Sequence, residues 1–495
     1  MATFSFRSPF TLIPTRLLLL LLLILIFISP VRQNTLPHHL SSSSTPPSTP
    51  KSPIQSNPRN APVSLSFATA PLMPETSMDA PPSTSFTSKP TNSIARQITE
   101  KFSTTERIEQ DLGRARAAIR KAIRTLNYTS DKEEIYVPTG PVYRNAYAFH
   151  QSHIEMVKRF KVWVYREGEL PMAHIGPLSY IYSIGGQFMD EMERGDSPFL
   201  ASHPDEAHAF FVPLSISKIT DCFAVLDPRT FFDRMIRIFT DYVHVVADKY
   251  PYWNRSSGGD HFMVSCHDWA PLIDRHDHKL YKNFIRVLCN ANTSEGFKPM
   301  RDVSLPEFNL KGHPLYNLGP TRYGVAPSER TILAFFAGAA HGDIRDILFL
   351  HWKEKDDEVQ VYENLPKEKN YHKLMGQSKY CLCPSGSEVA SPRVVEAMYQ
   401  ECVPVIISDY YTLPFSDVLD WSKFSVFVPP KRIPEIKTIL KGISQRKYLT
   451  LQKRVTQVAR HFELNRPSKP FDVIHMVLHS VWLRRLNIML TEHVY

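Results

Sequence analysis

Hydrophobic and polar positions along residues 145–408 follow two periods, which predict two kinds of element. The stretch 145–160 has apolar residues at helical spacing, whereas 161–165, 207–214 and 261–266 are short apolar runs typical of strands. Strands that are separated by helices imply parallel sheets. We therefore expect an α/β region that begins near residue 145.

A second region with the same alternation begins with the predicted strand 331–338, which ends in Gly338. A predicted helix, 341–356, and a predicted strand, 358–362, follow it. This βαβ start carries a glycine turn at the carboxyl end of its first strand, without the full GxGxxG pattern of dinucleotide sites. The Gly- and Pro-rich segment 311–330 is interpreted as a linker between the two regions.

The segment CLCPSGSEVASPRVVEAMYQECVPVIIS, residues 381–408, predicts one further crossover of a parallel sheet. A strand over 379–383 leads into the loop 384–392, then a helix over 392–401 and a strand over 403–408. Ligands of such sheets bind at the carboxyl ends of the strands. The loop 384–392 is therefore expected to face a ligand.

A cation stands at the predicted start of that helix, where the helix dipole is already positive. We expect Ser391 to cap the helix and Pro392 to be its first residue. Arg393 then costs on the order of a few tenths of a kcal/mol, unless an anion such as a diphosphate binds beside it. Glu396, one turn further, is placed to accept the hydroxyls of a ribose. The alternative is a local Arg393–Glu396 ion pair or a surface arginine.

The first 94 residues differ from the rest of the chain. Leu17–Ile28 is an unbroken apolar run that follows basic residues, which we interpret as a transmembrane signal anchor over 17–31 with a cytosolic tail, 1–16. A cleaved signal peptide is the alternative, and both place the remainder in the secretory lumen. Residues 32–94 are rich in Ser, Thr and Pro, which predicts a disordered stem.

Residues 95–144 are expected to hold a helix and a linker. Apolar residues recur at helical spacing over 106–126, which predicts either a basic amphipathic stalk helix or a helix packed on the catalytic body. We expect an N-terminal domain over 145–327 and a C-terminal domain over 328–464. A last helix within 465–495 is expected to pack back across both.

All six cysteines follow residue 221, and in an oxidising lumen some of them can pair. Cys381 and Cys383 share one face of a strand, so they should not bond each other. Neither a CxxC pair nor a Cys/His ligand set occurs, so we expect no zinc. Three N-x-S/T sequons at Asn127, Asn254 and Asn292 fit glycosylation in the lumen. The net charge of +9 is dispersed, so we reject nucleic acid as a partner.

Several motifs together resemble one enzyme family over about residues 145 to 490. They are CPSGSEVASPRVVEAMYQECVPVIISDYYTLPFSDVLDW, RFKVWVYREGELP (159–171), IGGQFMDE (184–191), YPYWNRSSGGDHFMVSCHDWAP (250–271), LAFFAGAAHGDIR (333–345) and HMVLHSVWLRRLN (475–487). The chain resembles the plant branch of the exostosin-like glycosyltransferases, family 47, and within it enzymes near xylogalacturonan xylosyltransferase. The chain departs from the family at Ser387, where an aromatic residue usually follows CPSG, which puts donor affinity or choice in question.

The resemblance implies a GT-B fold, in which two Rossmann-like domains face a cleft, and an inverting transfer without a cofactor. It implies a UDP-sugar donor in the C-terminal domain, a polysaccharide acceptor and a type II protein of the Golgi membrane. Since the chain has no Asp-x-Asp motif, we expect the transfer to need no metal ion.

Inversion requires a general base for the acceptor hydroxyl and charge stabilisation for the leaving diphosphate. Asp268, just after a predicted strand, is our first choice for the base, and a structural role is the alternative for each candidate. The other candidates are His267, Asp260 and His261. The residues expected on the donor side are Ser385, Ser391, Arg393, Glu396, Gly338, Arg345 and Arg330.

Three hypotheses of function remain open. The chain is an active transferase that builds a cell-wall polysaccharide, pectin or hemicellulose. Alternatively it is an inactive transferase-like partner of other Golgi glycosyltransferases, for which Ser387 is the only hint. The third hypothesis is a glycan-binding structural protein without a nucleotide site. Binding of UDP separates the third from the others, and turnover separates the first from the second.

Overall fold

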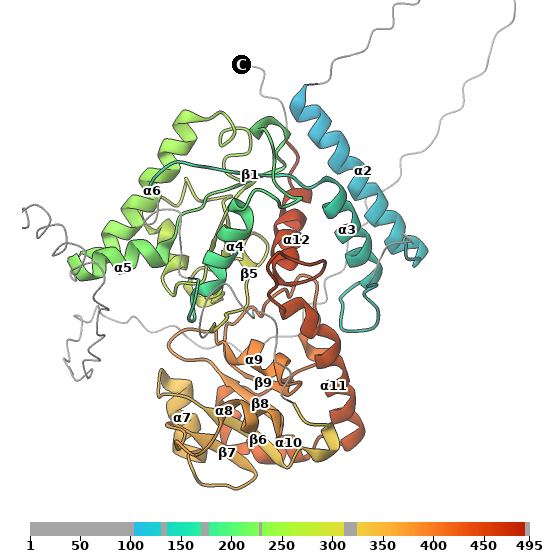
Figure 1. Cartoon of the computed structure of the whole chain (residues 1–495), viewed down its shortest axis with the longest axis vertical. Helices are drawn as coiled ribbons and strands as arrows, with labels where there is room; N and C mark the ends of the chain where they lie inside the picture. The colour runs from blue at the N-terminus through green and yellow to red at the C-terminus, as the bar shows by residue number, and fades with distance from the viewer. Residues whose placement is uncertain (1–102, 130–135, 170–177, 227–229, 311–323, 491–495) are drawn as a thin grey trace, which may run out of the picture. The chain divides into compact units, whose positions relative to one another are not determined.

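The computed structural model describes residues 103–129, 136–169, 178–226, 230–310 and 324–490 (Figure 1). The predicted anchor and stem lie outside these residues. None of the helices in these ranges has the length and hydrophobicity of a membrane-spanning segment.

Two five-stranded sheets, both parallel throughout, form the framework, as the alternation of strands and helices predicts. The first sheet has the order β1-β2-β3-β4-β5 and the second the order β10-β9-β8-β6-β7. The strands of the first are β1 (Val162–Val164), β2 (Ala209–Phe211), β3 (His261–Ser265), β4 (Ile285–Leu288) and β5 (Val303–Ser304). Those of the second are β6 (Ile332–Ala337), β7 (Val359–Tyr362), β8 (Ser378–Pro384), β9 (Val403–Ile407) and β10 (Val426–Phe427). Two such α/β regions fit a GT-B-like fold.

Helices cover both sheets. Around the first sheet lie α2 (Thr104–Thr125), α3 (Ala146–Arg159), α4 (Ser183–Glu193), α5 (Ile216–Leu226), α6 (Phe231–Lys249) and α12 (Val473–Leu486). Around the second lie α7 (Asp343–Trp352), α8 (Tyr371–Gly376), α9 (Arg393–Tyr399), α10 (Ile436–Lys441) and α11 (Gln445–Val458).

Alternating side chains of the first sheet enter two separate cores, because successive residues of a strand point to opposite faces. Phe211 and Phe262 belong to the core that also contains residues of α3, α4 and α12. Phe210 and Met263 belong to the core that is shared with α6. Helices therefore bury both faces of this sheet, as is usual for parallel sheets.

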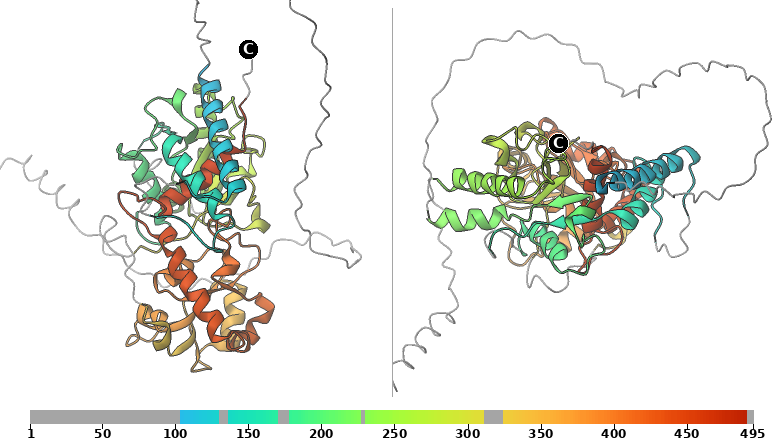
Figure 2. Two further views of the ribbon diagram at one scale, coloured as in Figure 1. Left: turned by 90° about the vertical axis from the view of Figure 1, so that its right-hand side faces the viewer. Right: turned by 90° about the horizontal axis from the view of Figure 1, so that it is seen from above.

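The helix predicted over 106–126 is α2, and it packs on the folded body. Its first turn is closed by a capping box, in which Ser103 Oγ accepts a hydrogen bond from the Glu106 amide at 3.2 Å and Glu106 Oε2 accepts one from the Ser103 amide at 2.8 Å. Ile108, Leu112 and other apolar residues on one face are buried in the larger core. Figures 1 and 2 show α2 beside α3, so the segment follows the packed alternative.

The last helix returns to the first sheet, since α12 contacts α3, β4 and β5. Arg485 is fully buried, donates a hydrogen bond to the His208 carbonyl at 2.8 Å and pairs with Glu109 of α2 at 2.7 Å. Arg485 therefore fastens α12 to α2 and to the residue that precedes β2.

Two disulfides each join neighbouring strands of a sheet. Cys266–Cys289 joins the ends of β3 and β4, and Cys381–Cys402 joins β8 to the residue before β9. Cys383 is free, in agreement with the expectation that it does not bond Cys381.

Candidate functional site

A pocket of about 720 Å³ opens at the carboxyl ends of the second sheet and is faced by loops of the first. Its lining combines loop residues after β6, β7 and β8 with residues that follow β3 and β5. The residues used below are Asp268, Glu307, Asn309, Gly338, Arg345, Tyr371, Ser387, Glu388, Arg393 and Glu396.

The strand order explains why the pocket lies there. The chain enters the second sheet at β6, continues to β7 on one side and then to β8 on the other. The loops after β6 and β8 therefore diverge, and such a switch point is the usual ligand site of an open parallel sheet. The predicted crossover of residues 379–408 is the part of the fold that builds this edge.

Helix α9 begins at Arg393, and its N-cap is Pro392, which corrects the expectation that Ser391 caps it. Ser391 is buried, and its hydroxyl lies 3.5 Å from Nη1 of Arg393 instead of accepting an amide hydrogen. The prediction of a Ser391 cap and of Pro392 as the first helical residue is therefore wrong by one residue. The proline ends the loop and still fixes the backbone before Arg393.

The guanidinium of Arg393 is fixed across the pocket floor. Its Nε and Nη2 donate to the carbonyl of Ala337, at 3.2 and 2.8 Å, and its Cζ lies 4.9 Å from the centre of the Phe336 ring. The close approach requires Gly338, because a Cβ at that position would lie 2.0 Å from Arg393 Nη2. The predicted glycine turn thus makes room for the arginine of a different crossover.

A second arginine lies beside the first. Arg345 is buried, its Cζ lies 5.8 Å from the centre of the same Phe336 ring, and its Nη1 donates to the Ala339 carbonyl at 3.3 Å. Its Nε is buried with no hydrogen-bond partner among the described residues. Burial, together with the like charge of Arg393, lowers the pKa of Arg345 to about 10. Two guanidinium groups that repel each other in one pocket favour a bound anion.

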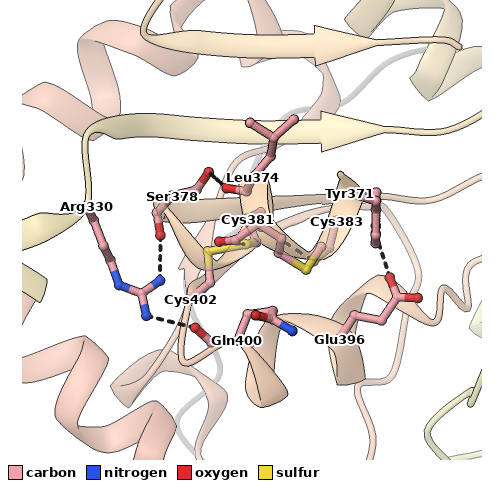
Figure 3. The surroundings of a disulfide bond; sticks show 10 residues. Arg330, Tyr371, Leu374, Ser378, Cys381, Cys383, Glu396, Gln400 and Cys402 are labelled. Carbon is pink, nitrogen blue, oxygen red and sulfur yellow. Dashed lines mark hydrogen bonds between the residues drawn. A yellow bond between two sulfur atoms is a disulfide. The ribbon is translucent and has the colours of Figure 1, made fainter. Parts of the chain in front are cut away.

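Glu396 lies one turn into α9 and also lines the pocket. Its Oε2 accepts a hydrogen bond from the Tyr371 hydroxyl at 2.6 Å, and not from Arg393, so the structure does not show the local ion pair that was the alternative for Arg393. Figure 3 shows the Tyr371 and Glu396 side chains directed at each other. The other carboxylate oxygen of Glu396, Oε1, accepts no hydrogen bond from a described residue and is open to a ligand hydroxyl.

Asp268 reaches the pocket from the loop after β3. The Tyr182 hydroxyl donates to its Oδ2 at 2.8 Å, and Asn290 Nδ2 donates to its main-chain carbonyl at 3.1 Å. The Cys266–Cys289 disulfide fixes the base of the same loop. Burial raises the pKa of Asp268, whereas the hydrogen bond from Tyr182 lowers it. A positioned carboxylate with a raised pKa can act as a general base.

Two further carboxyl groups of the pocket were not predicted. Burial raises the pKa of Glu307 to about 8, with a further rise from Asp268, and raises that of Glu388 to about 7, with a further rise from Glu295. Asn290 Nδ2 also donates to Glu388 at 2.6 Å, which links the loop after β4 to the loop after β8. For Glu307 the one sequence signal is a charged residue among apolar neighbours shortly after a strand, between the buried Leu305 and Phe308.

The other predicted bases lie outside the pocket lining. Asp260 and His261 are at the amino end of β3, fully buried, and opposite the carboxyl end that carries Asp268. Burial raises the pKa of Asp260, but the ion pair with Arg255 at 2.8 Å and His261 outweigh it and hold the pKa below its usual value. His267 is buried against Tyr182, and burial lowers its pKa to about 4. The contacts of these three residues are those of structural side chains.

Arg330 and Ser385 likewise lie outside the lining. Arg330 donates to the carbonyls of Ser378 at 2.7 Å and Gln400 at 2.8 Å, at the start of β8 and the end of α9. Figure 3 shows it on one side of the Cys381–Cys402 disulfide, with Tyr371 and Glu396 on the other. Ser385 is buried, and its hydroxyl lies 2.6 Å from that of Ser408 and 3.1 Å from the Val389 carbonyl. Ser385 supports the pocket loop from beneath.

The three sequons differ in exposure. Asn127 and Asn254 are exposed, whereas Asn292 is buried, and its side-chain oxygen accepts hydrogen bonds from the Ser294 amide and hydroxyl at 3.0 and 2.7 Å. Glycosylation of all three stays a prediction. Within the described ranges, no group of three or more His, Cys, Asp or Glu side chains is arranged to hold a metal ion.

Comparison with known proteins gives a consistent result. Residues 156–443 match the exostosin GT47 domain. A probable glycosyltransferase of Arabidopsis thaliana is 49% identical over 398 residues, which cover 79% of this chain and 74% of that protein. A probable beta-1,4-xylosyltransferase of the same plant is 28% identical over 300 residues, 58% of this chain and 72% of that protein. A probable glucuronosyltransferase of Physcomitrium patens is also 28% identical over 300 residues, 58% of this chain and 66% of that protein. The chain belongs to the exostosin GT47 family of glycosyltransferases.

Proposed function

We propose that this protein transfers a sugar, with inversion, from a UDP-sugar to a plant cell-wall polysaccharide of the pectin or hemicellulose class. The observation that carries the proposal is the pocket in which Arg345 and Arg393 of the second α/β region face Asp268 of the first. The names of two plant relatives, a probable beta-1,4-xylosyltransferase and a probable glucuronosyltransferase, support the transfer of a sugar of this kind. The two regions would then be the halves of a GT-B enzyme, with the donor on the C-terminal side.

The chain's own groups can perform both tasks of such a transfer. Asp268 removes the proton of the acceptor hydroxyl while that oxygen attacks the anomeric carbon of the donor sugar. The bond from that carbon to the diphosphate oxygen breaks, and its electron pair leaves with UDP. Arg345 and Arg393 stabilise the charge that develops on the diphosphate. The scheme asks for no metal ion or cofactor.

Glu396 is assigned to the ribose, because its free carboxylate oxygen lies one turn of helix beyond Arg393. With this assignment, the nucleotide binds along α9, and the sugar of the donor lies next to the loops of the first region that line the pocket. The leader and the sequons support a Golgi type II membrane protein whose catalytic body is in the lumen.

The proposal is tested by measuring the UDP that the purified full-length protein releases from each of a panel of UDP-sugars, without added metal. We expect release from one donor, and a fall of about a hundredfold or more in kcat in Asp268→Asn with the affinity for UDP retained. The matched control is Asp274→Asn, since Asp274 is outside the pocket lining. Turnover that survives Asp268→Asn would rule out Asp268 as the base.

A transferase-like partner that binds UDP without turnover is a second candidate. Ser387, where an aromatic residue is usual in the family, lines the pocket and is exposed. This candidate would be favoured if the protein binds UDP but releases no UDP from any UDP-sugar, with or without an acceptor.

A further inference from the structure

Glu307 is a carboxyl group of the pocket that the proposed transfer does not yet use. It follows β5 in the extended segment 305–310, in which Leu305 and Phe308 are buried in the core while Glu307 and Asn309 line the pocket. The buried neighbours fix the segment. The Ser183 hydroxyl also donates to the Phe308 carbonyl at 3.2 Å, which holds the backbone between the two pocket residues.

No described residue forms a hydrogen bond with the Glu307 carboxyl group, although the other pocket carboxyls have donors. Asp268 accepts from Tyr182, Glu388 from Asn290 and Glu396 from Tyr371. A partly buried carboxyl group without a partner is costly to keep, unless a ligand completes it. Its place in the lining makes a ligand of this pocket the natural partner.

The position of Glu307 relates it to the transferred sugar. In the proposed transfer, the acceptor hydroxyl lies at Asp268 and the diphosphate lies at Arg345 and Arg393. The anomeric carbon that passes between them therefore lies in the space between these groups. Glu307 lines the same pocket as Asp268, Arg345 and Arg393, so a sugar held between these groups lies within its reach.

We propose that Glu307, assisted by Asn309, hydrogen-bonds hydroxyl groups of the sugar of the donor and thereby determines which UDP-sugar is used. The inference rests on the proposed function and extends it from the nucleotide to the sugar. A raised pKa keeps Glu307 protonated near neutral pH, so the group can both donate to and accept from sugar hydroxyls. A protonated acid also avoids repulsion of a uronic acid sugar.

Calorimetry of the full-length chain with UDP, UDP-xylose, UDP-glucuronate and UDP-galactose tests the inference. The readout is the dissociation constant of each UDP-sugar divided by that of UDP. For the UDP-sugar that the wild type binds, we expect Glu307→Ala to raise this ratio about tenfold and to leave UDP binding within about twofold. Glu307→Gln keeps a donor and an acceptor and should raise the ratio less, about threefold.

Glu435→Gln is the matched control, because it makes the same change at an exposed carboxylate that pairs with Arg432. Should Glu307→Ala fail to fold, Glu307→Asp can replace it, because it withdraws the same group by one methylene. This variant should weaken the binding of the UDP-sugar and leave the binding of UDP unchanged. The inference would be overturned if the Glu307 variants left the ratio of the two dissociation constants unchanged, whether because neither affinity changes or because UDP and the UDP-sugar lose affinity equally. A wild type that binds no UDP would instead contradict the proposed function on which the inference rests.

Discussion

The guanidinium of Arg393 occupies the space that a side chain at position 338 would need. A Cβ on Gly338 would lie 2.0 Å from Nη2 and 2.9 Å from Cζ. The glycine at the end of β6 and the arginine at the start of α9 are therefore one structural unit, although more than fifty residues of sequence separate them.

Gly338→Ala should displace Arg393 and weaken UDP binding. We expect a loss of about tenfold or more, because a charge-assisted contact to phosphate is worth about 1.5–3 kcal/mol. Isothermal calorimetry with UDP measures it. Gly113→Ala in helix α2 is the control, since no atom beyond the neighbouring residues and backbone of that helix lies within 4 Å of the added Cβ. It should leave UDP binding unchanged. Equal UDP affinity in Gly338→Ala and wild type would show that the position of Arg393 does not matter to the donor.

Tyr182→Phe should move the acid limb of the pH–rate profile to higher pH. Asp268 acts as a base only when it is ionised, so turnover is present above its pKa and lost as the pH falls through it. The hydrogen bond from Tyr182 lowers the pKa of Asp268, and its removal raises that pKa. The measurement is kcat/KM between pH 5 and 8 for both proteins. A profile that keeps its acid limb while the rate falls would mean that Tyr182 acts on another group.

Glu307→Gln should change how stability depends on pH. The folded-state pKa of Glu307 is raised to about 8 from an ordinary value of 4.5, so the folded protein binds a proton that the unfolded chain has lost. The stability associated with the protonated group is present below pH 4.5 and is lost as the pH rises towards 8. The apparent Tm of the wild type, measured at pH 5, 6.5 and 8, should therefore fall relative to that of Glu307→Gln. Parallel curves would contradict a raised pKa at this residue.

Arg330→Ala should lower stability without weakening UDP binding by the folded protein. Its guanidinium is buried and satisfies the carbonyls of Ser378 and Gln400, so its loss should cost about 1–3 kcal/mol. Thermal unfolding and calorimetry of the same samples separate the two effects. A variant that is as stable as the wild type but binds UDP weakly would show that Arg330 takes part in donor binding.

The crossovers of the second sheet could be predicted because their apolar runs and loops are long and regular. The strands β6, β7, β8 and β9 all lie at the predicted segments within a few residues. Short strands such as β5 and β10 span two residues each, and their extended form depends on neighbours that local sequence does not encode.

The candidate site was predictable where a residue follows a strand or starts a helix, as Asp268 and Arg393 do. Arg330 is adjacent to β6 in sequence, but it lies at the amino end of that strand and outside the pocket lining. Glu307 and Glu388 lie far apart in the sequence, and only the tertiary structure shows that both line the same pocket. The raised pKa values follow from burial that the sequence does not show.

The central claim is that Arg345 and Arg393 together hold the diphosphate of a UDP-sugar. It is tested most directly by the affinity for UDP of the wild type, Arg345→Ala, Arg393→Ala and the double variant, alongside the surface control Arg432→Ala. We predict that the wild type and the control bind UDP alike, and that each single pocket variant binds it at least about tenfold more weakly. Binding of UDP that is unchanged in both single variants and in the double variant would contradict the account.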